Sequence, residues 1–424
     1  MEVIQKQSEI PLIITKINNL SKLKELFINS NITRFAIMNN LEQIQCEYAE
    51  IENLGNNTYK NIFNFNPRKT VNNTHFNAVL IIPTGIGAEI GGDSGDGNVV
   101  AKLIGNVVDN LFTHPNVVNA ADINEMTSNT LYIEGSVLND FLLGNIGLQP
   151  VRSNKILMLY DKNDTEVENL AINAASSARV TIGCEIDCLR IEDAPNYKTG
   201  YTGNGLAVGN IANFEKLTSI LSKYKDDYDS FVLHTKMEGE EDVLTGYFNG
   251  NIVVNPWGGA ESIITHSLSN LLNINVAHSP MLFDNNDIFQ LQGYKVVDPV
   301  KSPEVMSKTE LFCTIKGMFK APKIVEYSCE AGIFTNRDIH VLITPDRCIG
   351  LPLLAALEQN IIVIAIDDGR NVMKNDLECL PWNKGQFFKA KNYFEAVGIL
   401  TAIKNGISVK SFERPISKTK IINE

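Results

Sequence analysis

The chain has 424 residues, of which 44% are hydrophobic and 20% are charged, close to the average for soluble globular domains. This length is enough for two or three domains, each with its own core. The 49 acidic residues outnumber the 37 Lys and Arg residues, so the formal net charge is −12. Such a charge argues against a general nucleic-acid binder and against a protein held on anionic lipid, because both need a basic face.

The N-terminal sequence predicts a cytoplasmic protein. It has no basic region followed by an apolar run and a cleavage site, and no stretch approaches 18 uninterrupted apolar residues. We therefore expect neither a secretory signal nor a membrane span. The seven cysteines are odd in number and scattered, which favours unpaired thiols over a disulfide framework or a structural zinc site.

Residues 1–77 predict a small N-terminal α/β module and an Asn-rich linker. Short apolar runs at residues 10–14 and 35–38 suit strands, and residues 21–28 between them suit a helix. Residues 53–77 include nine Asn, which is typical of a linker or an excursion rather than a core element. We place a domain boundary near residue 77.

From residue 78 onward, short apolar runs alternate with longer amphipathic segments. This alternation predicts an α/β core with a doubly wound, mostly parallel sheet over residues 78–416. The pattern leaves open whether this core is one sheet or two Rossmann-like lobes with a boundary near residues 230–260. Residues 417–424 are expected to form a tail. Strands are predicted at residues 78–82, 155–160, 231–233, 252–254, 340–344 and 361–366, and helices at 99–112, 166–179, 260–272, 303–319, 351–359 and 393–404.

The densest candidate site is a glycine-rich segment, residues 83–97, between a predicted strand and a predicted helix. Its six glycines allow the backbone to approach a ligand closely, and the helix that follows offers free N–H groups. The spacing completes neither the dinucleotide fingerprint nor the Walker pattern. The ligand-binding candidates here are Thr84, Gly85, Gly87, Glu89, Gly91, Gly92, Asp93 and Asp96.

The three carboxylates of this segment bear on the kind of ligand. They would repel a bare phosphate unless a cation intervened, so they favour an amine, sugar hydroxyls or a divalent cation such as Mg²⁺. The alternative is a structural loop whose acids are solvated.

Residues 113–125 concentrate His, Asn, Asp and Glu, as ligand-facing loops do. His114 is a candidate general acid or base, and Asp122 or Glu125 would orient it. Asn116 and Asn119 are candidates for ligand binding. Alternatively, these side chains cap helix ends and bind backbone groups.

Residues 255–259 repeat the arrangement of a strand, a Gly-Gly turn and a helix start. The ligand-binding candidates of this turn are Asn255, Trp257, Gly258 and Gly259. His278, after the next apolar segment, is a weaker second base. His266, on the predicted helix, is expected to be a satisfied, partly buried residue.

Two further loops follow predicted strands near the C-terminus, and such loops bind ligands in doubly wound sheets. Gly350 precedes a predicted helix, and Arg370 and Asn371 follow the next strand. Arg370 is a candidate anchor for an anionic group. Cys348 is expected to be an ordinary thiol, because no neighbouring residue is identifiable as its base.

Several of these segments together resemble the bacterial domain-of-unknown-function family 3326. The resemblance covers residues 78–416, whereas residues 1–77 look like an addition, and Gly92 and Asp93 depart from the family pattern. The family has no settled activity, so the resemblance points at the same loops and implies no reaction. The segments that carry it are residues 81–92, 113–126, 147–154, 254–259, 277–281, 350–359 and 370–377.

We expect a cytoplasmic enzyme that acts on a small polar metabolite, either a carboxylate or a phosphorylated compound. Lyase, isomerase and transferase chemistry all fit, with Mg²⁺ as a candidate cofactor. The expected partner is a small-molecule substrate, with no nucleic acid and no membrane, and a homo-oligomer is compatible with the sequence.

Two other functions stay open. One is a two-lobed nucleotide-sugar transferase, although Ala355 or an apolar neighbour stands where those enzymes carry an acidic residue. The other is a non-catalytic small-molecule sensor, with residues 1–77 as its docking module.

Overall fold

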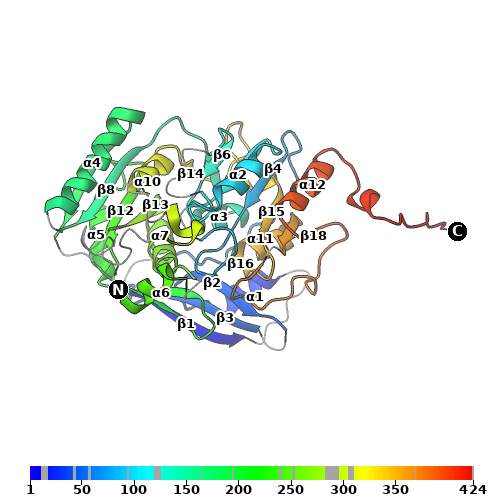
Figure 1. Ribbon diagram of the computed structural model, residues 1–424, viewed down its shortest axis with the longest axis horizontal. Helices are drawn as coiled ribbons and strands as arrows, with labels where there is room; N and C mark the ends of the chain where they lie inside the picture. Colours follow the sequence, from blue (N-terminus) through cyan, green and yellow to red (C-terminus); the bar gives the residue numbers. More distant parts are fainter. Residues whose placement is uncertain are drawn as a thin grey trace.

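The structure is a computed structural model, and its described residues form a mixed α/β protein with two parallel sheets, a six-stranded antiparallel sheet and a two-stranded antiparallel pair. In Figure 1 the antiparallel sheet lies below the two parallel sheets. The predicted mixture of helices and parallel strands is confirmed. The described residues are 1–422 without residues 11–17, 42–43, 56–58, 93–94, 119–125, 164, 193–194, 238–240, 251–253, 282–295, 304–309 and 368.

The antiparallel sheet has the strand order β10-β11-β1-β3-β2-β16. It joins the N-terminal segment to later parts of the chain, since Val3 pairs with Ile211 and Ile37 pairs with Ile349. The segment predicted as a separate N-terminal module therefore shares its sheet with the core. The elements of this layer are β1 (Glu2–Ile10), α1 (Asn19–Leu26), β2 (Ile32–Asn39), β3 (Ile44–Glu52), β10 (Asn196–Tyr201), β11 (Ala207–Ala212) and β16 (Ile349–Gly350).

The first parallel sheet has the order β18-β17-β15-β4-β5-β6 and carries helices on both faces. Side chains of successive strand residues alternate, so Ala78 and Leu80 pack with α2 and α12, while Val79 packs with α3 and α11. The elements are β4 (Asn77–Leu80), α2 (Asn98–Gly105), β5 (Asn110–Thr113), β6 (Thr130–Tyr132), α3 (Gly135–Leu142), β15 (Ile339–Pro345), α11 (Leu351–Gln359), β17 (Ile362–Ile366), β18 (Phe387–Ala390) and α12 (Tyr393–Lys404).

The second parallel sheet has the order β13-β12-β8-β9 and is also covered on both faces. Met158 and Val232 face α4 and α10, whereas Leu159 and Leu233 face α5 and α7. The elements are β8 (Lys155–Asp161), α4 (Thr165–Ile182), β9 (Glu185–Ile191), α5 (Phe214–Ser222), β12 (Ser230–Lys236), α7 (Gly258–Leu272), β13 (Asn275–Met281) and α10 (Glu310–Phe319).

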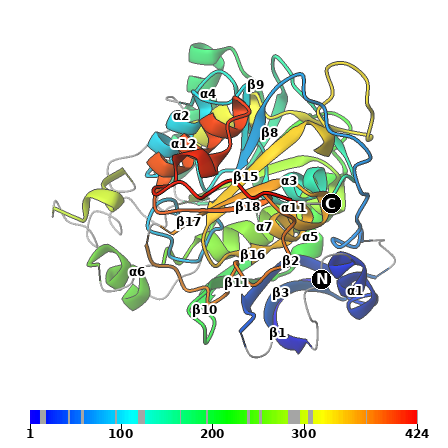
Figure 2. The ribbon, with the colours of Figure 1, turned by 90° about the vertical axis from the view of Figure 1, so that its right-hand side faces the viewer.

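Helix α7 lies where the three sheets meet. It packs against β2 and β11 of the antiparallel sheet, against β13 of the second parallel sheet, and against α3, which covers the first (Figure 2). The remaining elements are α6 (Glu241–Phe248), the pair β7 (Gly147–Gln149) and β14 (Lys323–Val325), and the 3-10 helices η2 (Pro299–Lys301), η3 (Asn336–Asp338) and η4 (Val409–Phe412).

The predicted helices at residues 351–359 and 393–404 match α11 and α12, and the predicted strand at residues 155–160 matches β8. The helix predicted at residues 99–112 is wrong in its second half, because α2 ends at Gly105 and Leu111 and Phe112 belong to β5. Their apolar side chains continue the helical spacing, but they pair with Ala78 and Val79 in the sheet. Most of the strand predicted at 252–254 lies outside the described residues. Among the described helices, none combines the length and apolarity that a membrane crossing requires.

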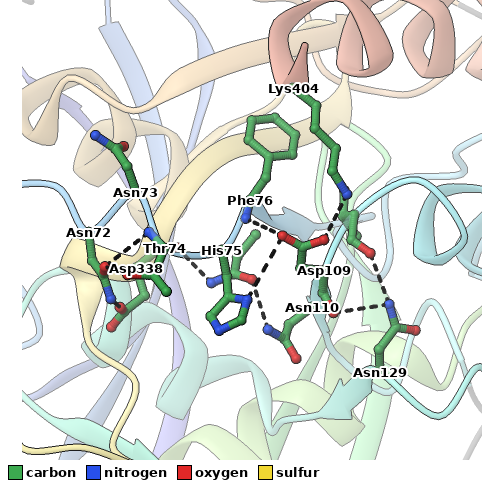
Figure 3. Close-up of polar contacts among 12 residues, drawn as sticks. Asn72, Asn73, Thr74, His75, Phe76, Asp109, Asn110, Asn129, Asp338 and Lys404 are labelled. Carbon is green, nitrogen blue, oxygen red and sulfur yellow. Dashed lines mark hydrogen bonds and ion pairs between the residues drawn. The ribbon is translucent and has the colours of Figure 1, made fainter. Parts of the chain in front are cut away.

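A network of polar residues ties together the amino edge of the first parallel sheet (Figure 3). Asp109 Oδ2 accepts a hydrogen bond from the Phe76 backbone N–H at 2.7 Å, and Asp109 Oδ1 lies 2.7 Å from Lys404 Nζ. Asn129 Nδ2 donates to the Asp109 carbonyl oxygen at 3.2 Å. These contacts hold the loop before β5 against the start of β4 and against α12.

We predict that Asp109→Asn lowers the free energy of unfolding by about 0.5–1 kcal/mol at pH 7, since the amide keeps an acceptor for Phe76 but loses a partly exposed ion pair. Lys404 lowers the pKa of Asp109, so this contribution is present above the ordinary Asp pKa. It is lost as the pH falls through the lowered pKa. Urea unfolding should show a smaller difference between the wild-type protein and the variant at pH 2.5 than at pH 7. Equal stabilities at pH 7 would contradict this, and the exposed Asp226→Asn is the control.

Candidate functional site

A pocket of about 120 Å³ lies at the carboxyl edge of the first parallel sheet. Its walls come from the segments that follow β4, β5 and β15, from the start of α3, from α7, and from β2 of the antiparallel sheet. The polar side chains in its lining are Arg34, Thr84, His114, Asn139, Ser262 and His266. The apolar side chains include Phe35, Ile81, Ile86, Leu138, Leu206 and Met373.

Arg34 on β2 is the cation of this pocket. Its Nη1 donates to the Ala207 carbonyl at 3.3 Å, and its Nη2 donates to the Thr84 carbonyl at 3.0 Å. Burial lowers the pKa of Arg34 to about 10, so the guanidinium stays charged at neutral pH. Arg34 makes no ion pair with a carboxylate within the described part of the chain. The charge of the buried Glu47 acts on Arg34 without a direct ion pair, and a partly buried guanidinium without such a pair favours an anion bound beside it.

His114 follows β5 directly and contributes a neutral ring to the pocket. Its Nε2 accepts a hydrogen bond from the Ile82 backbone N–H at 3.1 Å, which places the proton of the neutral ring on Nδ1. Burial lowers the pKa of His114 to about 3, and the charge of His266 acts in the same direction. His114 is therefore a neutral donor at physiological pH. Asp122 and Glu125, the expected orienting residues, lie outside the described residues.

His266 and Glu134 form a pair next to His114. His266 Nε2 lies 3.4 Å from Glu134 Oε1, and the side chain of Glu134 is only 2% exposed. Glu134 also caps α3, where its Oε2 accepts from the backbone N–H groups of Ser136 and Val137 at 2.8 and 3.1 Å. The helix N-terminus thus stabilises the carboxylate. Burial lowers the pKa of His266, while the charge of Glu134 opposes this effect.

Arg34 and Glu134, in the pocket lining and beside it, were not among the predicted site residues, and His266 was expected to be a satisfied, partly buried residue. A charged residue inside the apolar strand at residues 32–38 was the available signal for Arg34. For Glu134, the signal was an acidic residue in front of a Gly-Ser helix start.

Gly258 and Gly259 let the start of α7 approach the segment after β4 and the start of β11, beside the pocket. A Cβ at Gly258 would overlap Thr84 Oγ1, and a Cβ at Gly259 would overlap the backbone of Ala207 and Val208. Glycine at these two positions is therefore required for the close packing of α7 against the two segments. Asn255 and Trp257 shape the same turn, because Asn255 Oδ1 accepts from the Trp257 backbone N–H at 3.0 Å and the Trp257 ring packs on Tyr247 and Phe248.

Of the predicted ligand-binding residues, the pocket lining includes Thr84 and Gly350, and Gly85 adjoins Thr84 with a φ of 76°. The later residues of the glycine-rich segment contact each other: both carboxylate oxygens of Asp96 accept from the Gly91 backbone N–H at 2.8 Å. Gly87, Gly91 and Gly92 adopt positive φ angles, as glycine allows. Asp93 lies outside the described residues.

The predicted anion anchor, Arg370, is paired elsewhere. Its Nε lies 3.0 Å from Glu89 Oε2, and the side chains of Arg370 and Glu89 are 66% and 47% exposed. This pair lines a separate small recess next to Asn371, whose Nδ2 donates to the Asp346 carbonyl at 3.1 Å. The structure therefore does not bring Arg370 together with His114.

The structure gives two further predicted site residues other contacts: Asn116 binds the backbone, and His278 lies in the second parallel sheet. Asn116 Nδ2 donates to the Ile82 carbonyl at 2.8 Å, and Asn119 lies outside the described residues. His278 lies on β13 of the second parallel sheet, where its Nε2 is 2.9 Å from Thr235 Oγ1 and its Nδ1 is 3.2 Å from Glu261 Oε1. His114 and His278 thus belong to different sheets.

Cys348 lines the pocket as a buried thiol. Burial raises the pKa of Cys348, which favours the protonated thiol over the nucleophilic thiolate. Among the described side chains, no group of three or more His, Cys, Asp and Glu residues is arranged to hold a metal ion.

The chain belongs to the family described as Protein of unknown function (DUF3326), which matches residues 77–413. It is also similar to an uncharacterized lipoprotein of Synechococcus sp., with 28% identity over 351 residues, 78% of this chain and 91% of the relative. No solved structure matches it significantly. The predicted cytoplasmic location is overturned by this relative, whose name describes a lipoprotein.

We predict that Gly259→Ala destabilises the protein by at least about 2 kcal/mol, because the added methyl group meets backbone atoms that cannot rotate away. The matched control is Gly398→Ala on α12, where an added Cβ meets nothing within 4 Å. That variant should be neutral or more stable by up to about 1 kcal/mol. Denaturant unfolding of both variants checks this prediction, and similar effects of the two substitutions would contradict the close packing.

Proposed function

We propose that the protein is an enzyme that acts on a small anionic metabolite, either a carboxylate or a phosphorylated compound, in the pocket around Arg34. The observation that carries this proposal is the charged Arg34 guanidinium in the pocket wall, which has no ion-pair partner among the described residues. An anionic group would pair with Arg34 and receive its remaining N–H donors.

The position of the pocket in the fold supports the proposal. Strands β4, β5 and β6 follow one another toward one side of the first parallel sheet, and β15, β17 and β18 follow one another toward the other side. This order supports our proposal of a doubly wound sheet, with a change of direction between β4 and β15. Ligands of such sheets bind at the carboxyl edge beside that change of direction, where Thr84 and the pocket lie.

The two histidines supply complementary chemistry. His266, with a lowered pKa and with Glu134 beside it, is suited to accept a proton as a general base. His114, held neutral, is suited to donate a hydrogen bond from Nδ1 to an oxygen of the substrate. Proton transfer at an atom next to the anionic group, as in lyases and isomerases, fits these roles.

The size of the pocket separates this proposal from its alternatives. A volume of about 120 Å³ is small beside the 300–1,000 Å³ of typical sites for larger ligands, which favours a small metabolite over a nucleotide sugar. The sensor alternative assigned docking to residues 1–77. Arg34 belongs to that segment and lines the pocket, which favours a role of the segment in ligand binding.

We predict that small carboxylates or phosphorylated compounds raise the melting temperature of the wild-type protein by about 3 °C at a hundredfold excess over Kd. Arg34→Gln should abolish this shift, because the anion loses its cationic partner. The control is Arg152→Gln, which removes an exposed arginine outside the pocket lining and should leave the shift unchanged.

A panel of small mono- and dicarboxylates, sugar phosphates and nucleotide sugars tests the proposal by thermal shift. A response to nucleotide sugars alone would favour the transferase alternative. The proposal fails if no small anion stabilises the wild-type protein, or if Arg34→Gln responds as the wild-type protein does.

A further inference from the structure

A second group of polar side chains lies at the carboxyl edge of the second parallel sheet. Asp161 is the last residue of β8, Thr235 lies next to the end of β12, and His278 lies on β13. Because side chains alternate along each strand, all three lie on the face that carries Leu159, Leu233 and α7. Their side chains belong to a different sheet from Arg34 and are absent from the lining of its pocket.

Asp161 is the unusual member of this group. The residue is only 3% exposed, and its Oδ2 accepts from the Lys236 backbone N–H at 2.7 Å. Its other oxygen, Oδ1, has no hydrogen-bond partner in the described part of the chain. Burial raises the pKa of Asp161 to about 6, and the charges of His278 and Lys236 oppose this effect. A buried carboxylate oxygen without a donor is costly to keep.

His278 and Tyr197 bring further polar side chains near Asp161. His278 links Thr235 to Glu261, at 2.9 and 3.2 Å, and Glu261 is one-quarter exposed on its side chain. Burial, with the charge of Glu261, raises the pKa of Glu310 at the start of α10 to about 8. Tyr197 of β10 interacts electrostatically with Asp161, and the centre of its ring lies 6.4 Å from that of His278.

We propose that this edge of the second parallel sheet is a second binding site, which takes a primary ammonium group of a small amine. Asp161 Oδ1 would accept one ammonium N–H and neutralise its charge, and the carboxylate of Glu261, which contacts His278, adds negative charge nearby. The described side chains here form no metal-binding group, which favours an organic cation over a metal ion. The site goes beyond the proposed function, because its ligand has the opposite charge to that of the Arg34 pocket.

The test uses methylammonium chloride as the probe and the full-length protein. Titration calorimetry should show saturable binding to the wild-type protein, whereas tetramethylammonium chloride, which has no N–H donor, should not bind. Asp161→Asn should weaken methylammonium binding at least tenfold. It should also raise the melting temperature of the unliganded protein, because it removes an unpaired buried charge.

Asp229 provides a matched control on the same sheet. It lies just before β12, accepts from the Lys155 backbone N–H at 2.8 Å, and pairs with Lys323 Nζ at 2.7 Å. Asp229→Asn should therefore lower the melting temperature and leave methylammonium binding unchanged. Thr235→Val, which removes the hydroxyl bound to His278, is a second variant and should weaken binding by a smaller factor.

The proposal is overturned if methylammonium and tetramethylammonium bind equally, or if Asp161→Asn binds methylammonium as the wild-type protein does. It is also overturned if Asp161→Asn and Asp229→Asn both lower the melting temperature, since Asp161 would then be a satisfied structural residue. Failure of the Arg34→Gln experiment would leave these outcomes unaffected, because that experiment uses anions.

Discussion

The Arg34 guanidinium connects two strands of the antiparallel sheet to the segment that follows β4 in the first parallel sheet. It lies on the antiparallel sheet and donates to the carbonyl of Thr84, after β4, and to the carbonyl of Ala207, at the start of β11. The same two segments receive the Gly-Gly start of α7, which approaches Thr84 and Ala207 too closely for any side chain at Gly258 or Gly259. This junction fixes the pocket wall, because Arg34 and Thr84 line the pocket and Ala207 adjoins Leu206, which also lines it.

Helix α7, which begins at this junction, connects the pocket to the second parallel sheet. Ser262 and His266 face the pocket, Thr265 Oγ1 donates to Glu134 at 3.1 Å, and Glu261 meets His278 at the edge of the second parallel sheet. Helix α7 therefore contributes side chains to two polar regions of different charge. One is the pocket, whose cation is Arg34, and the other is the carboxyl edge of the second parallel sheet, where Glu261 supplies a carboxylate. The pocket lining thus includes a cation, Arg34, although the chain has a net charge of −12.

Sequence patterns predicted those parts of the fold and site that depend on neighbours along the chain. Thr84 follows a predicted parallel strand and Gly350 lies in the loop after another, and the carboxyl ends of parallel strands converge, so their placement near one pocket was predictable. Arg34 was not predictable in this way, because its contacts with Thr84 and Ala207 span 50 and 173 residues. The pairing of Glu89 with Arg370 is similarly long-range, and it changes the expected role of both residues. The four-residue strand β5 was hidden because Leu111 and Phe112 also fit the spacing of the preceding helix.

The central claim is that the pocket holds an anion against Arg34. Crystals soaked in bromide test it most directly, because the anomalous signal of bromide locates an anion-binding site even when the substrate is unidentified. The account predicts a bromide peak within contact distance of the Arg34 guanidinium, between His114 and His266, that disappears in Arg34→Gln crystals. Bromide found only at exposed lysines, with none in the pocket, would contradict it.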